Sequence, residues 1–149
     1  MRRLLIVTHG TFAEGIRSSL SVLAGNTERI DVINCFVEGA ENNPKEAMLE
    51  IINKIPKEDE LLILTDLFGG SVNNMATAIV AEAGREDLHL VTGINLALTA
   101  ELLLNMDDKL TAETINATIE QAKDGIRYMN DEIPKMMAME SDKPEDLFN

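Results

Sequence analysis

The chain has 149 residues, 45% hydrophobic and 26% charged, which is typical of one globular domain with a substantial core. Its formal net charge of −13 disfavours nucleic acid as a ligand, because an acidic surface repels the phosphate backbone. No apolar run approaches the roughly 20 residues of a membrane span, and the apolar run near the N-terminus is too short for a signal peptide. We therefore expect a cytoplasmic protein whose acidic surface is either simply solvated or suited to a basic protein partner.

Four short apolar runs predict strands, and they lie at residues 3–8, 30–36, 61–66 and 88–93. Hydrophobic residues are continuous in each run, as in parallel strands that are covered on both faces. The second run contains Cys35, the single cysteine, which we interpret as a core residue. The fourth contains His89, which we expect to be a core or lining residue.

The segments between these runs have helical spacing and helix-start signals. Thr11 and Glu14 have the spacing of a capping box. Asn43 followed by Pro44 predicts the start of a second helix. We expect Ser71 to be the N-cap of a third.

The last part of the chain predicts two more helices. Residues 95–106 are apolar nearly all round, which indicates a helix buried on two sides or in an interface. A last helix is expected from Thr111 to Ile133, and its apolar spacing fits either core packing or a helix–helix seam. We therefore predict one domain at residues 1–133 and a mobile acidic tail at residues 134–149.

This order of elements predicts an α/β fold, with a doubly wound, mainly parallel sheet and helices on both faces. In a flavodoxin-like strand order of 2-1-3-4, ligands bind beyond the carboxyl ends of the first and third strands, where the order reverses. His9 follows the first predicted strand and Asp66 ends the third. The topology therefore brings a histidine and a carboxylate to one crevice.

The chemistry of this pair fits phosphoryl transfer. A carboxylate that binds one imidazole nitrogen fixes the tautomer and leaves the other nitrogen as a nucleophile. Gly69 and Gly70 allow the backbone to approach a ligand, and Ser71 opens a helix whose free N–H groups favour an anion. Together these residues indicate a phosphoryl group carried on His9.

Other sites of this fold class lack their required residues here. A receiver domain needs a pair of acids after the first strand, where this chain has Thr-His-Gly. A flavodoxin needs aromatic residues around its flavin, but only 3% of this chain is aromatic. No P-loop triplet and no metal-ligand spacing occur, so we expect no cofactor and no metal.

Three motifs, IVTHG, LTDLFGGSVNNMA and VTGINLALTAELL, occur in this order in the sequence. Over roughly residues 3–130 the chain resembles the mannose-family IIA component of the bacterial phosphoenolpyruvate:sugar phosphotransferase system. One departure is Val72, where the family often has proline.

The resemblance implies a phosphotransferase in which His9 is phosphorylated by the small histidine phosphocarrier protein and Asp66 is the paired carboxylate. The loop implied to line the phosphate site consists of Leu67, Phe68, Gly69, Gly70 and Ser71. The phosphoryl group would pass to a IIB component, here a separate chain, and then to a sugar that enters through membrane IIC and IID components. The resemblance also implies a homodimer and a transfer that uses no metal.

Two alternatives remain open. The phosphotransfer subunit of dihydroxyacetone kinase has a similar domain, but its motifs typically read S-H-S and D-[LM]-G-S-A. The Thr-His-Gly and the double glycine here favour the sugar system. The other alternative is a non-catalytic regulatory module of the same fold, which no accompanying DNA-binding or ATPase segment supports.

Overall fold

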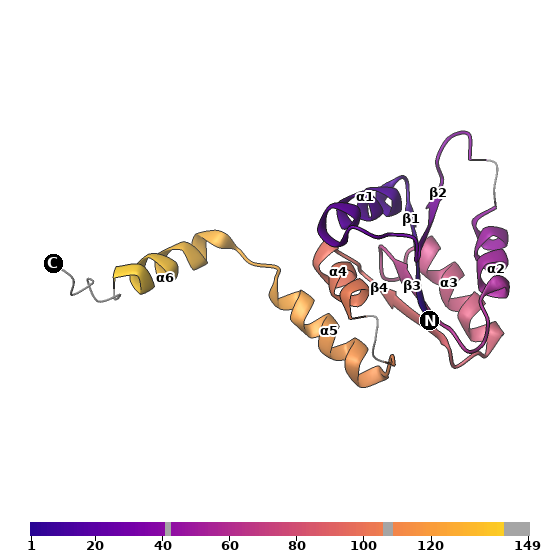
Figure 1. The fold of residues 1–149 in the computed structure, drawn as a ribbon. Coiled ribbons are helices and arrows are strands. Elements are labelled where there is room, and N and C mark those ends of the chain that lie inside the picture. The colour runs from indigo at the N-terminus through magenta and orange to yellow at the C-terminus, as the bar shows by residue number, and fades with distance from the viewer. Residues whose placement is uncertain (41–42, 106–108, 142–149) are drawn as a thin grey trace.

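The computed structural model describes residues 1–40, 43–105 and 109–141 (Figure 1). Within these ranges the chain forms a four-stranded parallel sheet in the order β2-β1-β3-β4. The strands are β1 (Arg2–His9), β2 (Ile30–Cys35), β3 (Glu60–Thr65) and β4 (Leu88–Thr92). The predicted flavodoxin-like α/β fold is confirmed.

Helices cover both faces of this sheet. The described helices are α1 (Phe12–Ala24), α2 (Pro44–Lys54), α3 (Ser71–Ala83), α4 (Leu96–Leu104), α5 (Ala112–Asp124) and α6 (Met129–Ser141). Figure 1 shows α1, α4 and α5 on one side of the sheet and α2 and α3 on the other. Each described helix is too short or too polar to cross a bilayer.

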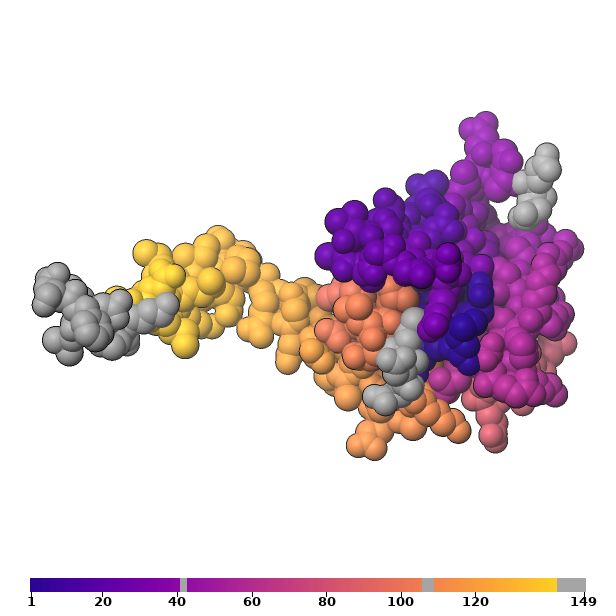
Figure 2. All heavy atoms as spheres, in the orientation of Figure 1, coloured from indigo at the N-terminus to yellow at the C-terminus, as the bar shows by residue number. Residues whose placement is uncertain are grey.

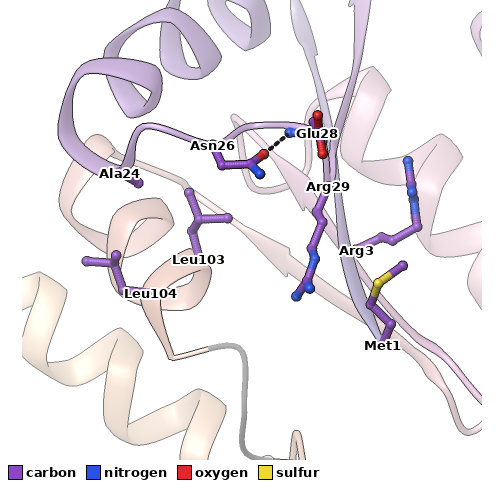
Figure 3. Close-up of a pocket in the computed structure, with 8 residues that line it drawn as sticks. All are labelled: Met1, Arg3, Ala24, Asn26, Glu28, Arg29, Leu103 and Leu104. Carbon is purple, nitrogen blue, oxygen red and sulfur yellow. Dashed lines mark hydrogen bonds between the residues drawn. The ribbon is translucent and has the colours of Figure 1, made fainter.

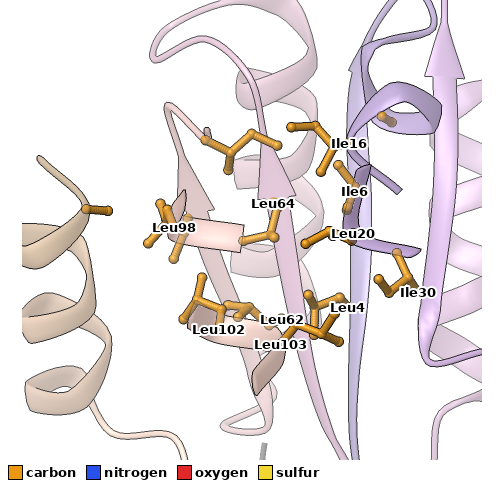
Figure 4. Close-up of a cluster of buried hydrophobic side chains, with 14 of the residues drawn as sticks. Leu4, Ile6, Ile16, Leu20, Ile30, Leu62, Leu64, Leu98, Leu102 and Leu103 are labelled. Atoms are coloured by element: carbon orange, nitrogen blue, oxygen red, sulfur yellow. The ribbon is translucent and has the colours of Figure 1, made fainter. Parts of the chain in front are cut away.

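The continuous apolar runs are explained by two separate cores. Leu4 and Ile6 of β1 join the cluster beneath α1 and α4 (Figure 4). Leu5 and Val7 point to the opposite face and join the cluster beneath α2 and α3. Because side chains alternate between faces, a strand covered on both faces needs apolar residues at every position.

The strand order reverses at β1. This strand pairs with β2 on one side and with β3 on the other. The register places Val7 opposite Thr65, so His9 at the end of β1 and Asp66 just after β3 lie at adjacent strand ends. The site therefore depends on the crossover from β2 to β3, which carries the chain past β1.

The predicted capping box of α1 is wrong. Thr11 precedes the helix with φ −95° and ψ 19° and makes no side-chain cap bond. An N-cap normally has extended backbone, which directs its side chain at the free N–H groups. Here Thr8 takes this role, since its hydroxyl oxygen accepts a 2.7 Å bond from the N–H of Ala13. Glu14 instead pairs with Arg17.

The N-cap of α3 is Gly70 rather than Ser71. Gly70 has extended backbone (φ −70°, ψ 165°), and Ser71 is the first helical residue. The serine hydroxyl therefore remains available, and it lies near His9. The predicted start of α2 is confirmed, because the Asn43 side chain accepts a 3.0 Å bond from the N–H of Lys45.

The single helix predicted from Thr111 to Ile133 is wrong, because α5 ends at Asp124 and α6 begins at Met129. Gly125 caps α5, and the next three residues are not helical. The apolar periodicity misled the prediction because it continues across the break.

The helix α6 has no buried residue, and it runs away from the layered part of the molecule (Figures 1 and 2). The helix α4 instead lies between α1 and α5, and it buries Leu98, Leu102 and Leu103. The apolar side chains that α4 buries are therefore covered by other parts of the same chain. The predicted division into a domain at residues 1–133 and a tail at residues 134–149 stays a prediction. The proposed boundary falls inside α6, and residues 142–149 lie outside the described residues.

Candidate active site

His9 and Asp66 are in contact at the carboxyl edge of the sheet. The ring Nδ1 of His9 lies 2.9 Å from Oδ2 of Asp66. The backbone N–H of His9 donates to the same oxygen at 2.8 Å. The other carboxylate oxygen accepts a 3.0 Å bond from the N–H of Leu67. Both carboxylate oxygens are therefore held by neighbours on two strand ends.

These bonds determine the tautomer of His9. Burial raises the pKa of Asp66, but the hydrogen bonds from the His9 backbone and ring outweigh this effect, and the pKa lies below its ordinary value. The ionised carboxylate can only accept, so Nδ1 of His9 carries a proton. In the neutral ring Nε2 is then the nitrogen with a free lone pair.

The nitrogen Nε2 is directed at the start of α3. It lies 3.3 Å from Oγ of Ser71, and the His9 side chain is 38% exposed. The hydroxyl of Ser71 can donate to the lone pair of this nitrogen. A solvent-accessible nitrogen with a fixed orientation is able to act as a nucleophile.

The two glycines of the loop serve different purposes. Gly69 has φ of +74°, which disfavours other residues. Gly70 has an ordinary φ, but a Cβ there would lie 3.2 Å from Cβ of Leu67 and 3.6 Å from Cε1 of His9. The second glycine therefore provides space beside the imidazole.

The free N–H groups lie in the first turn of α3. The N–H of Gly69 donates to Oδ1 of Asn73 at 3.1 Å, and that of Gly70 donates to the carbonyl of Leu67 at 3.1 Å. No described residue accepts a bond from the N–H of Ser71 or Val72. The helix start rather than the glycine amides thus offers donors to an anion.

Sequence reasoning missed Asn73, which is only 6% exposed. Its side-chain N–H donates to Oγ1 of Thr65 at 3.3 Å, and its side-chain oxygen accepts the bond from the N–H of Gly69. It thereby ties the loop to the end of β3. The available signal was an asparagine next to the apolar stripe of α3, since buried polar groups normally need partners.

Sequence reasoning also missed Phe36. Its ring centroid lies 5.5 Å from that of His9, with 33° between the two planes. Of the remaining predicted loop residues, Leu67 is 60% and Phe68 89% exposed. The site is therefore bordered by exposed apolar side chains.

Two other residues considered from the sequence, His89 and Cys35, are not part of the candidate site. His89 is near the amino end of β4, opposite Leu62, and burial lowers its pKa. Cys35 is fully buried at the end of β2, as predicted, and burial followed by the charge of Asp66 raises its pKa to about 11. A protonated buried thiol is a poor nucleophile.

The described residues contain no group of three or more His, Cys, Asp or Glu side chains that could hold a metal ion. A pocket of about 490 Å³ lies at the opposite edge of the sheet, near the start of β1 (Figure 3). It is lined by Met1, Arg3, Ala24, Asn26, Glu28, Arg29, Leu103 and Leu104. None of these residues contacts His9 or Asp66, so this pocket is separate from the candidate site.

Comparison with known proteins identifies the family. The sequence model described as "PTS system fructose IIA component" matches residues 3–120. The chain belongs to the IIA component family of the sugar phosphotransferase system (PTS). The resemblance to the mannose-family IIA component is thereby confirmed.

Individual relatives agree with this assignment. The chain is 24% identical to the PTS system fructose-specific EIIA component of Bacillus subtilis, over 98% of this chain and 99% of the relative. It is 30% identical to the mannose-specific EIIAB component of Escherichia coli, over 85% of this chain but 39% of that protein. A crystal structure of the EIIA component from Streptococcus agalactiae superposes with a TM-score of 0.75 at 30% identity, covering 87% of this chain and 98% of that one.

Proposed function

We propose that this IIA component is a phosphohistidine carrier. In this proposal Nε2 of His9 accepts a phosphoryl group from the histidine phosphocarrier protein and passes it to a IIB component for sugar uptake. The observation that carries the proposal is the 2.9 Å contact of Nδ1 with Asp66, which directs Nε2, the nitrogen with the lone pair in the neutral ring, toward Ser71.

The transfer breaks one P–N bond and forms another. The lone pair of Nε2 attacks phosphorus, the bond to the nitrogen of the donor breaks, and the donor imidazole regains its lone pair. His9 keeps the proton on Nδ1, so its phosphorylated ring is formally cationic. Asp66 stabilises that positive charge and holds the ring in line.

The negative phosphoryl oxygens need compensation, because Asp66 is also negative. The N–H groups of Ser71 and Val72 are the donors that support this role, together with the positive end of the α3 dipole. Gly69 and Gly70 shape the loop that allows the phosphoryl group to approach. Leu67 and Phe68 border the site, where they are exposed to an approaching protein.

The proposed partners follow from charge and from the family. The net charge of −13 supports docking of carrier proteins through a basic surface, which also speeds their encounter. The IIB component is proposed as a separate chain, and the membrane IIC and IID components as later recipients. The reaction itself needs no metal, and its proposed location is the cytoplasm.

We also propose that the protein is a homodimer. The support lies in the exposed apolar side chains between the end of α5 and the end of α6. These are Ile126, Tyr128, Met129, Ile133, Met136, Met137 and Met139. A second copy of the chain could cover this surface, which one copy leaves exposed to water.

Phosphorylation in a reconstituted system tests the proposal. The protein is incubated with phosphoenolpyruvate, enzyme I and the histidine phosphocarrier, and the phosphoryl content is measured before and after acid treatment. We expect one acid-labile phosphoryl group in the wild type and in His89→Gln, and none in His9→Ala. Equal labelling of His9→Ala would reject His9 as the acceptor.

A further inference from the structure

Phe36 combines a strained backbone with an exposed apolar side chain. Its φ of 62° makes it the one non-glycine residue with positive φ among the described residues. A side chain is disfavoured there because Cβ crowds the backbone. The phenyl group is also 72% exposed. Strain that persists beside a reactive group points to a role in function rather than in folding.

The position of this ring relative to His9 is fixed by the sheet. Cys35, the last residue of β2, is the register partner of His9. The carbonyl of Cys35 accepts a 2.8 Å bond from the N–H of Gly10. The residues after the two strand ends are thus held together, and the ring of Phe36 lies 5.5 Å from the imidazole in a tilted arrangement.

We propose that Phe36 is a positioning residue that packs against the His9 imidazole from the β2 side and protects its phosphorylated form from water. This inference rests on the proposed function. Asp66 and Ser71 act on the two ring nitrogens at the edge of the imidazole. They leave the ring free to tilt about the line between those contacts, and the phenyl group restricts that tilt.

Two physical effects favour the phosphorylated state. The π system of a phenyl ring attracts a neighbouring cation, and the phosphorylated imidazole is cationic when Nδ1 keeps its proton. The apolar ring also occupies space that water would otherwise fill. In hydrolysis a water oxygen attacks phosphorus, the P–Nε2 bond breaks, inorganic phosphate leaves with the water protons, and Nε2 regains its lone pair.

The lifetime of the phosphorylated protein tests this role. Phosphorylated protein is separated from its donor, and the release of inorganic phosphate is followed with time. We expect Phe36→Leu to hydrolyse about threefold to tenfold faster, the scale of one aromatic contact. Phe36→Tyr keeps the ring and should stay close to the wild type. The control is Phe12→Leu, another partly exposed phenylalanine with no described ring contact to His9.

A second variant separates this role from a structural one. Phe36→Gly removes the ring and relieves the positive φ, so its thermal unfolding midpoint should equal or exceed that of the wild type while its phosphoryl group is lost faster. A purely structural residue would lower stability and lifetime together. The NMR shifts of the His9 ring protons should also change in Phe36→Leu, with His89 as the internal reference.

The outcomes are distinguishable. Phosphoryl lifetimes in Phe36→Leu and Phe36→Gly equal to that of the wild type would overturn the positioning role while leaving the proposed function intact. A wild-type protein that accepts no phosphoryl group would overturn the proposed function, and this inference with it.

Discussion

One carboxylate oxygen of Asp66 accepts two hydrogen bonds from His9, at 2.8 Å from the backbone N–H and at 2.9 Å from Nδ1. The first bond holds the end of β1 against the end of β3. The second fixes the imidazole tautomer. The same side chain therefore joins the two strand ends and orients the imidazole.

Replacing Asp66 with asparagine tests the second role. The amide has no negative charge and can present its N–H₂ to the ring, which favours the wrong tautomer. We expect phosphoryl exchange to slow by about tenfold to a thousandfold, as for the loss of an orienting acid. Rapid-quench transfer from the phosphorylated carrier measures this effect. Wild-type rates in both directions would show that Asp66 only connects the strand ends.

Substitution of Gly70 tests the need for space beside the ring. The Cβ of Gly70→Val would approach Leu67 to 3.2 Å and His9 to 3.6 Å, so the loop must shift and change the proposed phosphoryl site. We expect phosphorylation to be blocked, at a folding cost of about 1–3 kcal/mol. The matched control is Gly15→Val on the exposed side of α1, where a Cβ meets nothing within 4 Å. A folded Gly70→Val protein, as judged by circular dichroism, that accepts phosphate normally would contradict this account.

The buried thiol of Cys35 predicts a specific pH dependence. Its pKa is raised from 9.0 to about 11 in the folded protein. The unfolded thiol therefore loses its proton first, and its contribution to stability is present below about pH 9 and declines toward pH 11. In denaturant titrations across this range, the wild type should lose more stability than Cys35→Val. The native thiol should also resist alkylation at neutral pH, and rapid labelling of folded protein would contradict its burial.

The exposed apolar surface of α6 predicts the oligomeric state. Met136 and Met137 are 56% and 66% exposed in one chain. Light scattering at micromolar concentration should give the mass of a dimer, and the double variant Met136→Glu, Met137→Glu should shift it toward the monomer. Val22→Glu, at an exposed apolar residue of α1, is the control. A monomeric wild type would reject the homodimer.

The sheet and its switch point could be predicted because a strand buried on both faces appears in the sequence as a continuous apolar run. The apolar runs around Ile6 and Ile63 could be recognised as buried strands without knowledge of tertiary contacts. Helix boundaries depend on local competition for hydrogen bonds, so the sequence did not reveal that Thr8 caps α1 or that Gly70 caps α3. The break after Asp124 was hidden because apolar spacing continues through it.

The candidate site was predictable only where topology places residues together. His9 ends β1 and Asp66 follows the neighbouring strand β3, so their contact follows from the strand order. Phe36 follows a strand end as well, but its approach to the imidazole depends on a positive φ that a phenylalanine rarely adopts. Asn73 contributes through a bond to a loop amide, which spacing alone does not indicate.

In the proposed mechanism, Nε2 of His9 carries the phosphoryl group while Nδ1 stays protonated toward Asp66. The most direct measurement is a long-range ¹H–¹⁵N correlation spectrum of the two imidazoles in ¹⁵N-labelled protein, recorded before and after phosphorylation. We predict that the Nε2 resonance of His9 acquires coupling to phosphorus, that its Nδ1 remains protonated, and that His89 is unchanged. Phosphorus coupling at Nδ1 of His9, or at either nitrogen of His89, would contradict the account.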